Sequence, residues 1–157
     1  MMASCDLFEI TLSGRGCHAA MPHLGTDTVL ASAALTLALH GLVGRRIDPQ
    51  DAAVVSVTQA HAGDTWNVLP ERALLRGTVR AFREGVQDTL EAAIRETAAA
   101  VAAAHRCTAA VRYAILVKPE QMVVKTLENT AMNRGVPVQT TATLEEAYGF
   151  LGLAPPA

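Results

Sequence analysis

Residues 7–13 read LFEITLS, and the order of apolar and polar residues in this stretch decides the class of fold that the sequence predicts. Phe8, Ile10 and Leu12 alternate with polar residues, so their side chains would share one face of a β-strand. The same period of two recurs in later stretches, which predict strands near 52–62, 69–82 and 107–117. Half-buried strands of this kind are typical of an antiparallel sheet with one covered face.

Two stretches between these strands have the residue spacing of α-helices. The first, 27–43, begins at a Thr-Asp pair that can cap a helix. It is apolar nearly all round, so we expect it to be buried on more than one side. In the second, 84–105, apolar residues recur every three or four positions, and Glu91 and Arg95 are spaced for an i,i+4 ion pair. The order strand–helix–strand–strand–helix–strand predicts an α+β domain of split βαβ (ferredoxin-like) type, a four-stranded antiparallel sheet with two helices on one face.

The residues after the fourth predicted strand have a different character. They predict a helix over 120–135, a short strand over 136–142 and a short helix capped by Thr143. We therefore divide the chain into a domain over 2–117 and a C-terminal appendage over 118–157, whose fold the sequence does not specify.

The composition argues against several classes of function. The net charge is −2 and no stretch gathers Lys and Arg, so the basic surface of a nucleic-acid-binding protein is missing. No run approaches the ~18 consecutive apolar residues of a membrane span, and the first residues lack the basic region of a signal peptide. The three cysteines form no CxxC pair, which argues against a disulfide framework and a thiolate zinc site. We expect a cytoplasmic protein that binds neither nucleic acid nor membranes.

A histidine lies in the glycine-rich loop GRGCHAAMPHLG at 14–25. From the residues alone, His18 could be a metal ligand, a catalytic group or an ordinary loop histidine. The metal interpretation is weak because His18 and His23 have no third ligand nearby, whereas zinc takes three or four protein ligands. Two other residues have similar alternatives. Asn67, in DTWNVLP, could be a turn residue, and Arg80 could be a solvated side chain on the open face of the sheet.

Three long stretches, taken together, resemble a known family. They are GRGCHAAMPHLGTDTV at 14–29, RRIDPQDAAVVSV at 45–57 and AGDTWNVLPERALLRGTVRAF at 62–82. In this order and spacing they are similar to the lid, or dimerisation, domain of the metal-dependent amidohydrolases. That family includes hippurate hydrolase, N-acyl-amino-acid hydrolases, indoleacetyl-amino-acid hydrolases and relatives of carboxypeptidase G. The resemblance covers about residues 2–115.

The resemblance implies a partner, a chemistry and roles for three residues. In that family two lids of split βαβ fold pair, which implies a homodimer. A larger catalytic domain holds two divalent metals (zinc, manganese or cobalt) and cleaves an N-acyl amino acid. By resemblance, His18 reaches into the partner's active site and polarises the scissile carbonyl, while Asn67 and Arg80 help bind the substrate's carboxylate and carbonyl. Cys17, where relatives usually have glycine, is a departure that would stiffen the loop.

The metal-binding motifs of the family are missing from this sequence. No His-x-Asp motif occurs, and the adjacent Glu145 and Glu146 would point about 100° apart on a helix, as on a solvated face. We therefore expect no metal site and no hydrolase activity in this chain alone. Residues 118–157 would be a diverged remnant of the catalytic domain or a foreign tail. Two further interpretations stay open: a non-catalytic dimeric interaction module, and a structural α+β domain whose resemblance is historical.

Overall fold

The computed structural model describes residues 4–116, 138–141 and 143–152 of the 157-residue chain. Its main elements are β1 (Cys5–Ser13), α1 (Thr28–His40), α2 (Val43–Arg46), β3 (Ala53–Ala62), β5 (Arg72–Ala81), α3 (Glu84–Ala104) and β6 (Thr108–Leu116). Three short elements lie between them: β2 (Cys17–His18), η1 (Pro22–Leu24) and β4 (Val68–Leu69). β7 (Val138–Thr141) and α5 (Leu144–Leu151) follow. The helix predicted over 120–135 lies outside the described residues.

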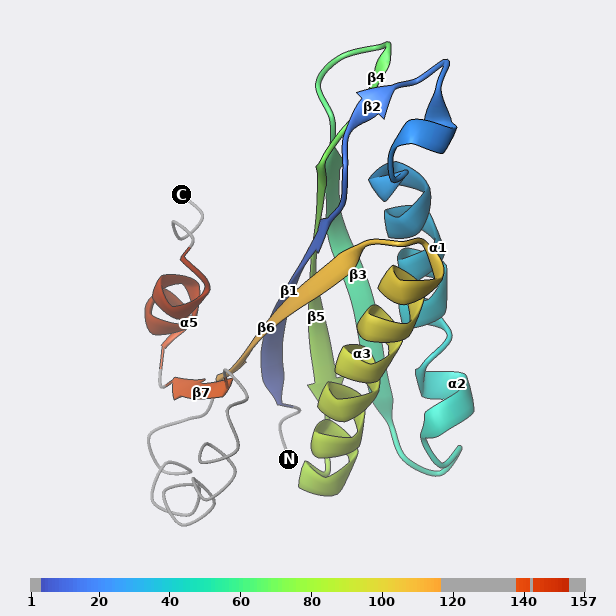
Figure 1. Ribbon diagram of the computed structural model, residues 1–157. Helices are drawn as coiled ribbons and strands as arrows, with labels where there is room; N and C mark the ends of the chain where they lie inside the picture. The colour runs from blue at the N-terminus through green and yellow to red at the C-terminus, as the bar shows by residue number, and fades with distance from the viewer. Residues whose placement is uncertain (1–3, 117–137, 142, 153–157) are drawn as a thin grey trace.

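The predicted four-stranded antiparallel sheet is confirmed (Figure 1). The strands lie in the order β3-β5-β1-β6-β7, and the first four are antiparallel to their neighbours. In the central strand, Phe8 lies opposite Gly77 of β5 and Tyr113 of β6. Gly77 has no room for a side chain, because an added Cβ would meet the Phe8 ring and the Ser56 carbonyl oxygen. The glycine therefore lets the aromatic ring lie across β5.

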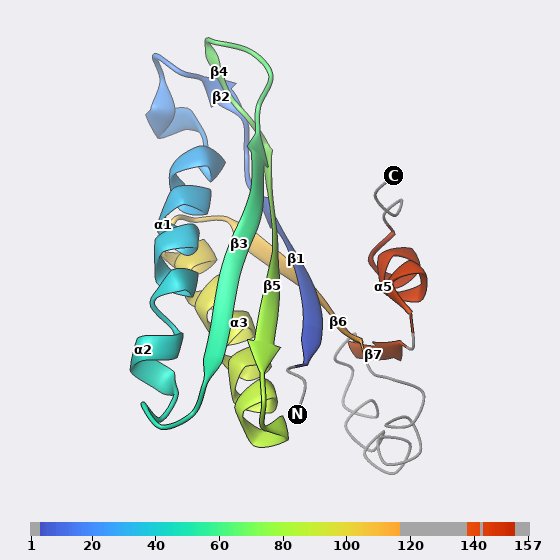
Figure 2. The same ribbon diagram turned by 180° about the vertical axis from the view of Figure 1, so that it is seen from behind.

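α1 and α3 cover one face of this sheet, as predicted (Figures 1 and 2). The apolar side chains expected on one face of β1 are buried there, since Phe8, Ile10 and Leu12 are at most 1% exposed. The two helices add large side chains to the same core: Leu35, Leu39, Leu90 and Ile94. Each aliphatic side chain that is fully buried contributes about 1.5–3 kcal/mol, so this single layer between sheet and helices supplies most of the hydrophobic stabilisation.

The first helix is exposed along one side, so the expectation that it is buried on more than one side is wrong for this chain. It begins at its predicted cap, where the Asp27 carboxylate accepts the backbone N–H of Leu30 at 2.8 Å. However, Leu30 and Leu37 are 56% and 78% exposed, and Ala33 between them is exposed as well. Residues at this spacing share one helical face. We call Leu30, Ala33 and Leu37 the α1 stripe.

β3 is the outer strand of the sheet on the side of α1. Its register with β5 shifts between Val57 and Gln59, which marks a β-bulge that the alternation in the sequence did not predict. Beside the bulge, His40 at the end of α1 accepts the backbone N–H of Val57 through Nε2 at 3.3 Å. Bulges bend an edge strand and increase its twist.

The C-terminal appendage extends the sheet at the opposite edge. β7 pairs in parallel with β6, and α5 begins at the predicted cap, where Thr143 Oγ1 accepts the backbone N–H of Glu146 at 3.1 Å. Ala147 of α5 is buried against Ala114 and Leu7. This small contact lies on the sheet face opposite α1 and α3 (Figure 2).

Candidate functional site

The loop that carries His18 pairs with the turn that carries Asn67. His18 of β2 lies directly opposite Val68 of β4, and the backbone N–H of Ala19 donates to the Asn67 carbonyl oxygen at 2.8 Å. The resulting two-stranded ribbon projects beyond the end of the main sheet (Figure 1). Two of the three residues singled out in the sequence therefore lie together at one tip of the molecule.

Close packing fixes the shape of the His18 loop. The backbone N–H of Thr26 donates to the Arg15 carbonyl oxygen at 2.8 Å, which joins the two ends of the loop. Gly25 is buried in this closure, and a Cβ added there would lie 2.6 Å from the Arg15 oxygen and 2.5 Å from Cys17 Sγ. Only glycine fits such an approach. The Cys17 side chain packs inside the loop, against Gly25.

The His18 side chain is exposed at the tip, and one of its ring nitrogens is engaged. The backbone N–H of Ala20 donates to Nδ1 at 3.1 Å, and the backbone N–H of Met21 donates to the His18 carbonyl oxygen at 2.8 Å. Residues 18–21 thus form a tight turn that holds the imidazole. Nε2 makes no hydrogen bond within the described part of the chain, so it is open to a ligand.

Large apolar side chains lie close to His18 in the same tip. Trp66 is fully exposed, and Met21 and Val68 are 49% and 45% exposed. Because Val68 lies opposite His18, the two side chains share a face of the ribbon. Exposed apolar surface of this kind beside a polar group is typical of a contact surface.

Arg80 lies at the other end of the sheet, near the start of β1. Its Nη1 donates to the Val79 carbonyl oxygen at 2.8 Å and lies 3.5 Å from the carbonyl oxygen of Asp6. These contacts hold one side of the guanidinium against the backbone. Its other N–H groups have no partner among the described residues, so they can make the paired hydrogen bonds by which arginine binds a carboxylate.

His18 and Arg80 cannot reach each other within one chain. β5 runs from Arg72, which lies opposite Ser13 at the base of the ribbon, to Ala81. The eight positions from Arg72 to Arg80 span about 26 Å at the rise of a β-strand, and β2, which contains His18, lies beyond the start of β5 (Figure 1). A site that uses both residues must therefore take them from two copies of the chain.

A buried polar cluster supports the strand ends near Arg80, and the sequence patterns did not predict it. The carboxylate of Asp6, which is fully buried, accepts hydrogen bonds from Gln87 Nε2 at 2.7 Å and from the Tyr113 hydroxyl at 3.0 Å. Burial, and then the negative charge of Asp6, raise the pKa of Tyr113 above its ordinary value. One sequence signal was available, namely an acidic residue just before the alternation of β1. Its partners, however, come from α3 and β6.

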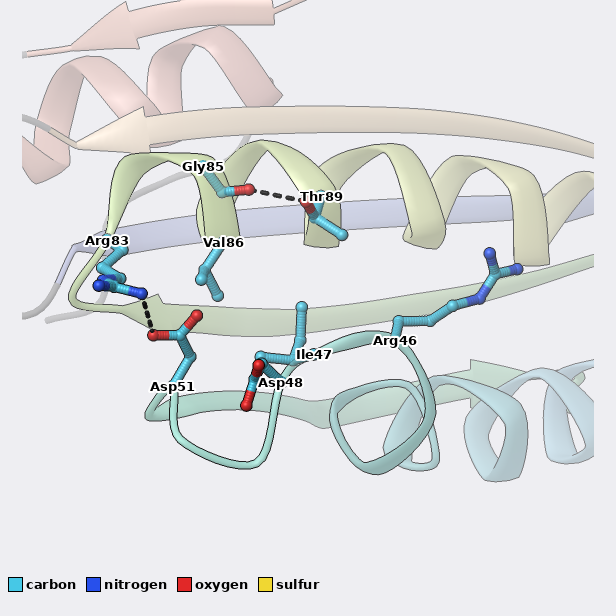
Figure 3. Close-up of a pocket in the computed structure, with 8 residues that line it drawn as sticks. All are labelled: Arg46, Ile47, Asp48, Asp51, Arg83, Gly85, Val86 and Thr89. Carbon is cyan, nitrogen blue, oxygen red and sulfur yellow. Dashed lines mark hydrogen bonds and ion pairs between the residues drawn. The ribbon is translucent and has the colours of Figure 1, made fainter.

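A pocket of about 370 Å³ lies between the loop after α2 and the start of α3 (Figure 3). Its arginines are already paired, because Arg83 contacts Asp51 at 2.8 Å and Arg46 contacts Glu96 at 3.0 Å. α2 and the start of α3 lie at the end of the molecule away from the ribbon (Figure 1). The pocket therefore does not contribute to a site at His18.

Metal and membrane features are missing from the described residues. No group of three or more His, Cys, Asp or Glu side chains there could hold a metal ion. None of the three cysteines forms a disulfide, and burial raises the pKa of the Cys107 thiol. Within the same part of the chain, no helix is both long enough and apolar enough to cross a membrane.

Sequence comparisons find that this domain is similar to parts of longer proteins, which are named as hydrolases and deacetylases. A family model described as a peptidase dimerisation domain matches residues 7–106. The chain is 38% identical over 110 residues to an IAA-amino acid hydrolase ILR1-like 2 of Arabidopsis thaliana. This match covers 70% of this chain and 25% of that protein. The chain is 36% identical over 91 residues to an N-acetyl-L-cysteine deacetylase of Bacillus subtilis, a match that covers 58% of this chain and 22% of that protein. An N-acetyldiaminopimelate deacetylase of Exiguobacterium sibiricum is 33% identical over an alignment of 155 residues, which covers 96% of this chain and 42% of that protein.

Solved structures give the same fold. A putative aminohydrolase of methicillin-resistant Staphylococcus aureus superposes with a TM-score of 0.69 at 20% identity, over 96% of this chain and 41% of that one. The YXEP protein of Bacillus subtilis, a dinuclear metal binding peptidase of the M20 family, superposes with a TM-score of 0.57 at 24% identity. That match covers 91% of this chain and 35% of the YXEP chain. The chain spans between 22% and 42% of the length of the three curated relatives. Since the family model covers more than half of its residues, the chain belongs to the peptidase dimerisation domain family of the M20 peptidases.

Proposed function

We propose that this chain is the lid and dimerisation domain of an M20 amidohydrolase that hydrolyses N-acyl amino acids, in the manner of hippurate hydrolase. The observation that carries the proposal is that most of the length of β5 separates His18 and Asn67, at the projecting ribbon, from Arg80. Such a separation suits an active site that is shared between two subunits. The names of the relatives, which are N-acetyl-amino-acid deacetylases and an IAA-amino acid hydrolase, support the class of substrate.

His18 would supply a hydrogen-bond donor to the scissile carbonyl of a substrate held by the partner subunit. When an amide is attacked, its carbonyl oxygen takes up negative charge, and one positioned donor lowers the barrier by about 3–4 kcal/mol. Asn67 would add its amide beside the same group, since its backbone is bonded to the His18 loop through Ala19. The projecting ribbon supports this role, because it could enter a neighbouring cleft without moving the sheet.

Arg80 would bind the carboxylate of the substrate's amino acid in its own subunit's site. Its guanidinium is held at Nη1 by two backbone carbonyl oxygens, those of Val79 and Asp6. The rest of the fork stays available for a bidentate contact. A free carboxylate is present in the substrate and in the transition state alike, so this contact would mainly serve binding.

The described residues do not fit a metal ion. In the proposed enzyme the two divalent metals (zinc, manganese or cobalt) belong to a catalytic domain, where they supply Lewis-acid chemistry. We expect no hydrolase activity from this chain alone. Residues 118–157 fit a diverged remnant of that domain better than a foreign tail, because the match to the Exiguobacterium sibiricum relative covers 96% of the chain.

The homodimer would form along β3 and the α1 stripe. In the described part of the chain the edge strands of the sheet are β3 and β7, and β3, with 10 residues against 4, offers the longer edge for pairing. α1 packs beside β3 and carries Leu30, Ala33 and Leu37 outward. A two-fold axis at the β3 edge, perpendicular to the sheet, would keep both α1 helices on one face of the joined sheet, where the two stripes could meet and remove apolar surface from water.

The alternative is a non-catalytic dimeric interaction module, which the exposed α1 stripe would serve equally well. The gene decides between the two. Flanking sequence that encodes a His-x-Asp motif and further metal-ligating Glu residues supports the hydrolase, and the enzyme made from that gene should cleave hippurate or an N-acetyl amino acid. Flanking sequence without such motifs supports the module. In either case we propose a cytoplasmic protein, since none of its cysteines forms a disulfide.

A further inference from the structure

One hydrogen bond decides which ring nitrogen of His18 carries the proton. The backbone N–H of Ala20 donates to Nδ1 at 3.1 Å. A nitrogen that accepts a hydrogen bond presents its lone pair, so the proton of the neutral imidazole must lie on Nε2. This side chain and the N–H two residues later make the same contact by which Asn and Asp close a turn.

We propose that the Ala20 amide is a positioning group that locks neutral His18 in the Nε2–H tautomer. The bond from Met21 N–H to the His18 carbonyl oxygen, at 2.8 Å, closes the same turn. The turn therefore sets the orientation of the ring and its tautomer together, and leaves Nε2–H at the exposed outer end of the ring. The catalytic use of this group rests on the function proposed above, whereas the tautomer does not.

With the proton on Nε2, neutral His18 can act as a hydrogen-bond donor through this atom but not as a general base. An Nε2 that carries a proton can donate to a carbonyl oxygen on which negative charge develops. The same atom has no lone pair with which to take a proton from water, so neutral His18 cannot act as a general base through Nε2. The Ala20 amide thus selects the electrophilic role before any substrate arrives.

His40 provides a contrast within the same chain. Its Nε2 accepts the backbone N–H of Val57 at 3.3 Å, so its proton must lie on Nδ1. The structure therefore assigns opposite tautomers to two histidines of the same chain.

Nitrogen NMR of the imidazole rings in the whole chain tests the assignment. Spectra are recorded at roughly pH 8.5, about two units above the reference pKa of free imidazole. His18 should show a bare Nδ1 and a protonated Nε2, and His40 the reverse. Relative to the urea-unfolded chain, the ratio of Nε2–H to Nδ1–H at His18 should rise about fivefold, the factor expected from one net hydrogen bond. A ratio equal to that of the unfolded chain, or a majority of Nδ1–H, overturns the proposal.

Two substitutions at residue 20 isolate the amide. Ala20→Gly keeps the N–H and should keep the tautomer of His18. Ala20→Pro has no N–H and should return His18 to the ratio of the unfolded chain, while His40 keeps its Nδ1–H form and reports that the sheet is folded. A wild-type ratio at His18 in a folded Ala20→Pro variant shows that another group sets the tautomer. If Ala20→Pro does not fold, the comparison of wild type with the unfolded chain tests the proposal by itself.

A third variant connects the turn to catalysis in the full-length enzyme. His18→Asn retains an acceptor for the Ala20 N–H but has no donor at the position of Nε2. We expect it to keep the turn and to lose as much activity as His18→Ala. If NMR shows the Nε2–H tautomer at His18 but the His18→Ala enzyme is fully active, the proposed function is wrong and the tautomer assignment is retained. If the tautomer ratio at His18 equals that of the unfolded chain but His18→Ala loses activity, the tautomer assignment is wrong and the proposed function is retained.

Discussion

His18 and Arg80 lie near opposite ends of the molecule: β2, which contains His18, belongs to the ribbon beyond one end of the main sheet, and Arg80 lies near the other end of β5. The strand alone accounts for about 26 Å. Both residues are nevertheless held in place, His18 by the turn that ends at Met21 and Arg80 by the carbonyl oxygens of Val79 and Asp6. Two well-positioned polar groups that cannot meet in one chain are suited to meet across two.

Removal of the two side chains should affect different kinetic constants of the full-length enzyme. His18→Ala should lower kcat by about 10²–10³, the usual loss for one oxyanion donor. Arg80→Ala should mainly raise KM, because a carboxylate contact acts on ground state and transition state alike. Steady-state kinetics on a series of N-acyl amino acids measure both constants, and metal content measured in parallel shows that the catalytic domain is intact. A His18→Ala enzyme with unchanged kcat contradicts the proposed role.

Gly25→Ala should destabilise the domain by about 1–3 kcal/mol, as overpacked substitutions do. Its Cβ would lie 2.6 Å from the Arg15 carbonyl oxygen and 2.5 Å from Cys17 Sγ, so the His18 loop would have to open. The matched control is Gly44→Ala in α2, where no atom lies within 4 Å of the added Cβ. That change should be neutral or stabilising by up to about 1 kcal/mol, because alanine favours helix. Urea unfolding of both variants measures the difference, and equal stabilities would show that the loop is loosely packed.

Tyr113 should make the stability of the domain fall at high pH. Burial and the Asp6 carboxylate raise the pKa of its phenol above the ordinary 10.0. In the unfolded chain the phenol loses its proton above about pH 10, whereas the folded state retains it. The stabilisation from Tyr113 is therefore complete below pH 10 and is lost above it, by about 1.4 kcal/mol per pH unit.

Urea unfolding at a series of values from roughly pH 8 to pH 11 measures this slope. Tyr113→Phe should be less stable at neutral pH, by about 1–3 kcal/mol, because Asp6 loses a donor inside the core. The same variant should show a shallower decline above pH 10. Identical slopes in the wild type and in Tyr113→Phe would mean that the phenol ionises in the folded protein.

Leu37→Glu should prevent the homodimer from forming. Leu37 is 78% exposed in the α1 stripe, so the charge is tolerated in the monomer but would be buried without a partner in the interface. Ala100→Glu, at an exposed position of α3, is the control and should remain dimeric. Sedimentation at tens of micromolar distinguishes the two, since an interface of about 800 Å² per partner should hold at such concentrations. Dimers of Leu37→Glu as stable as those of the control would exclude the α1 stripe from the interface.

Local patterns were sufficient to predict the elements of the fold. The alternation around Phe8 and Ile10 identified both β1 and its buried face. Asp27 caps α1 as its position suggested, and Glu91 contacts Arg95 at 2.9 Å as the i,i+4 spacing implied. All of these depend on residues close in sequence, for which periodicity and capping preferences are direct physical signals.

Contacts between distant residues could not be predicted in this way. Asp6 finds its donors on Gln87 and Tyr113, and no local pattern connects a charged strand residue with a partner on a later helix. The meeting of His18 with Asn67 depends on the two-residue strands β2 and β4, which are too short to have a period. Leu37 shows a different limit, because its hydrophobicity indicates a need for burial but does not say which chain provides the cover.

Mixing two variants of low activity tests most directly whether His18 acts in the active site of the partner subunit. Full-length His18→Ala and Arg80→Ala proteins are combined in equal amounts under conditions that allow subunits to exchange, and kcat/KM is measured at low substrate. Half of the dimers should be mixed, and one of the two sites in each mixed dimer would contain both His18 and Arg80. Activity should therefore rise to about a quarter of the wild-type value, far above either variant alone. If exchange is complete and activity stays at the average of the two variants, His18 and Arg80 do not share a site across the dimer, and the proposed function is contradicted.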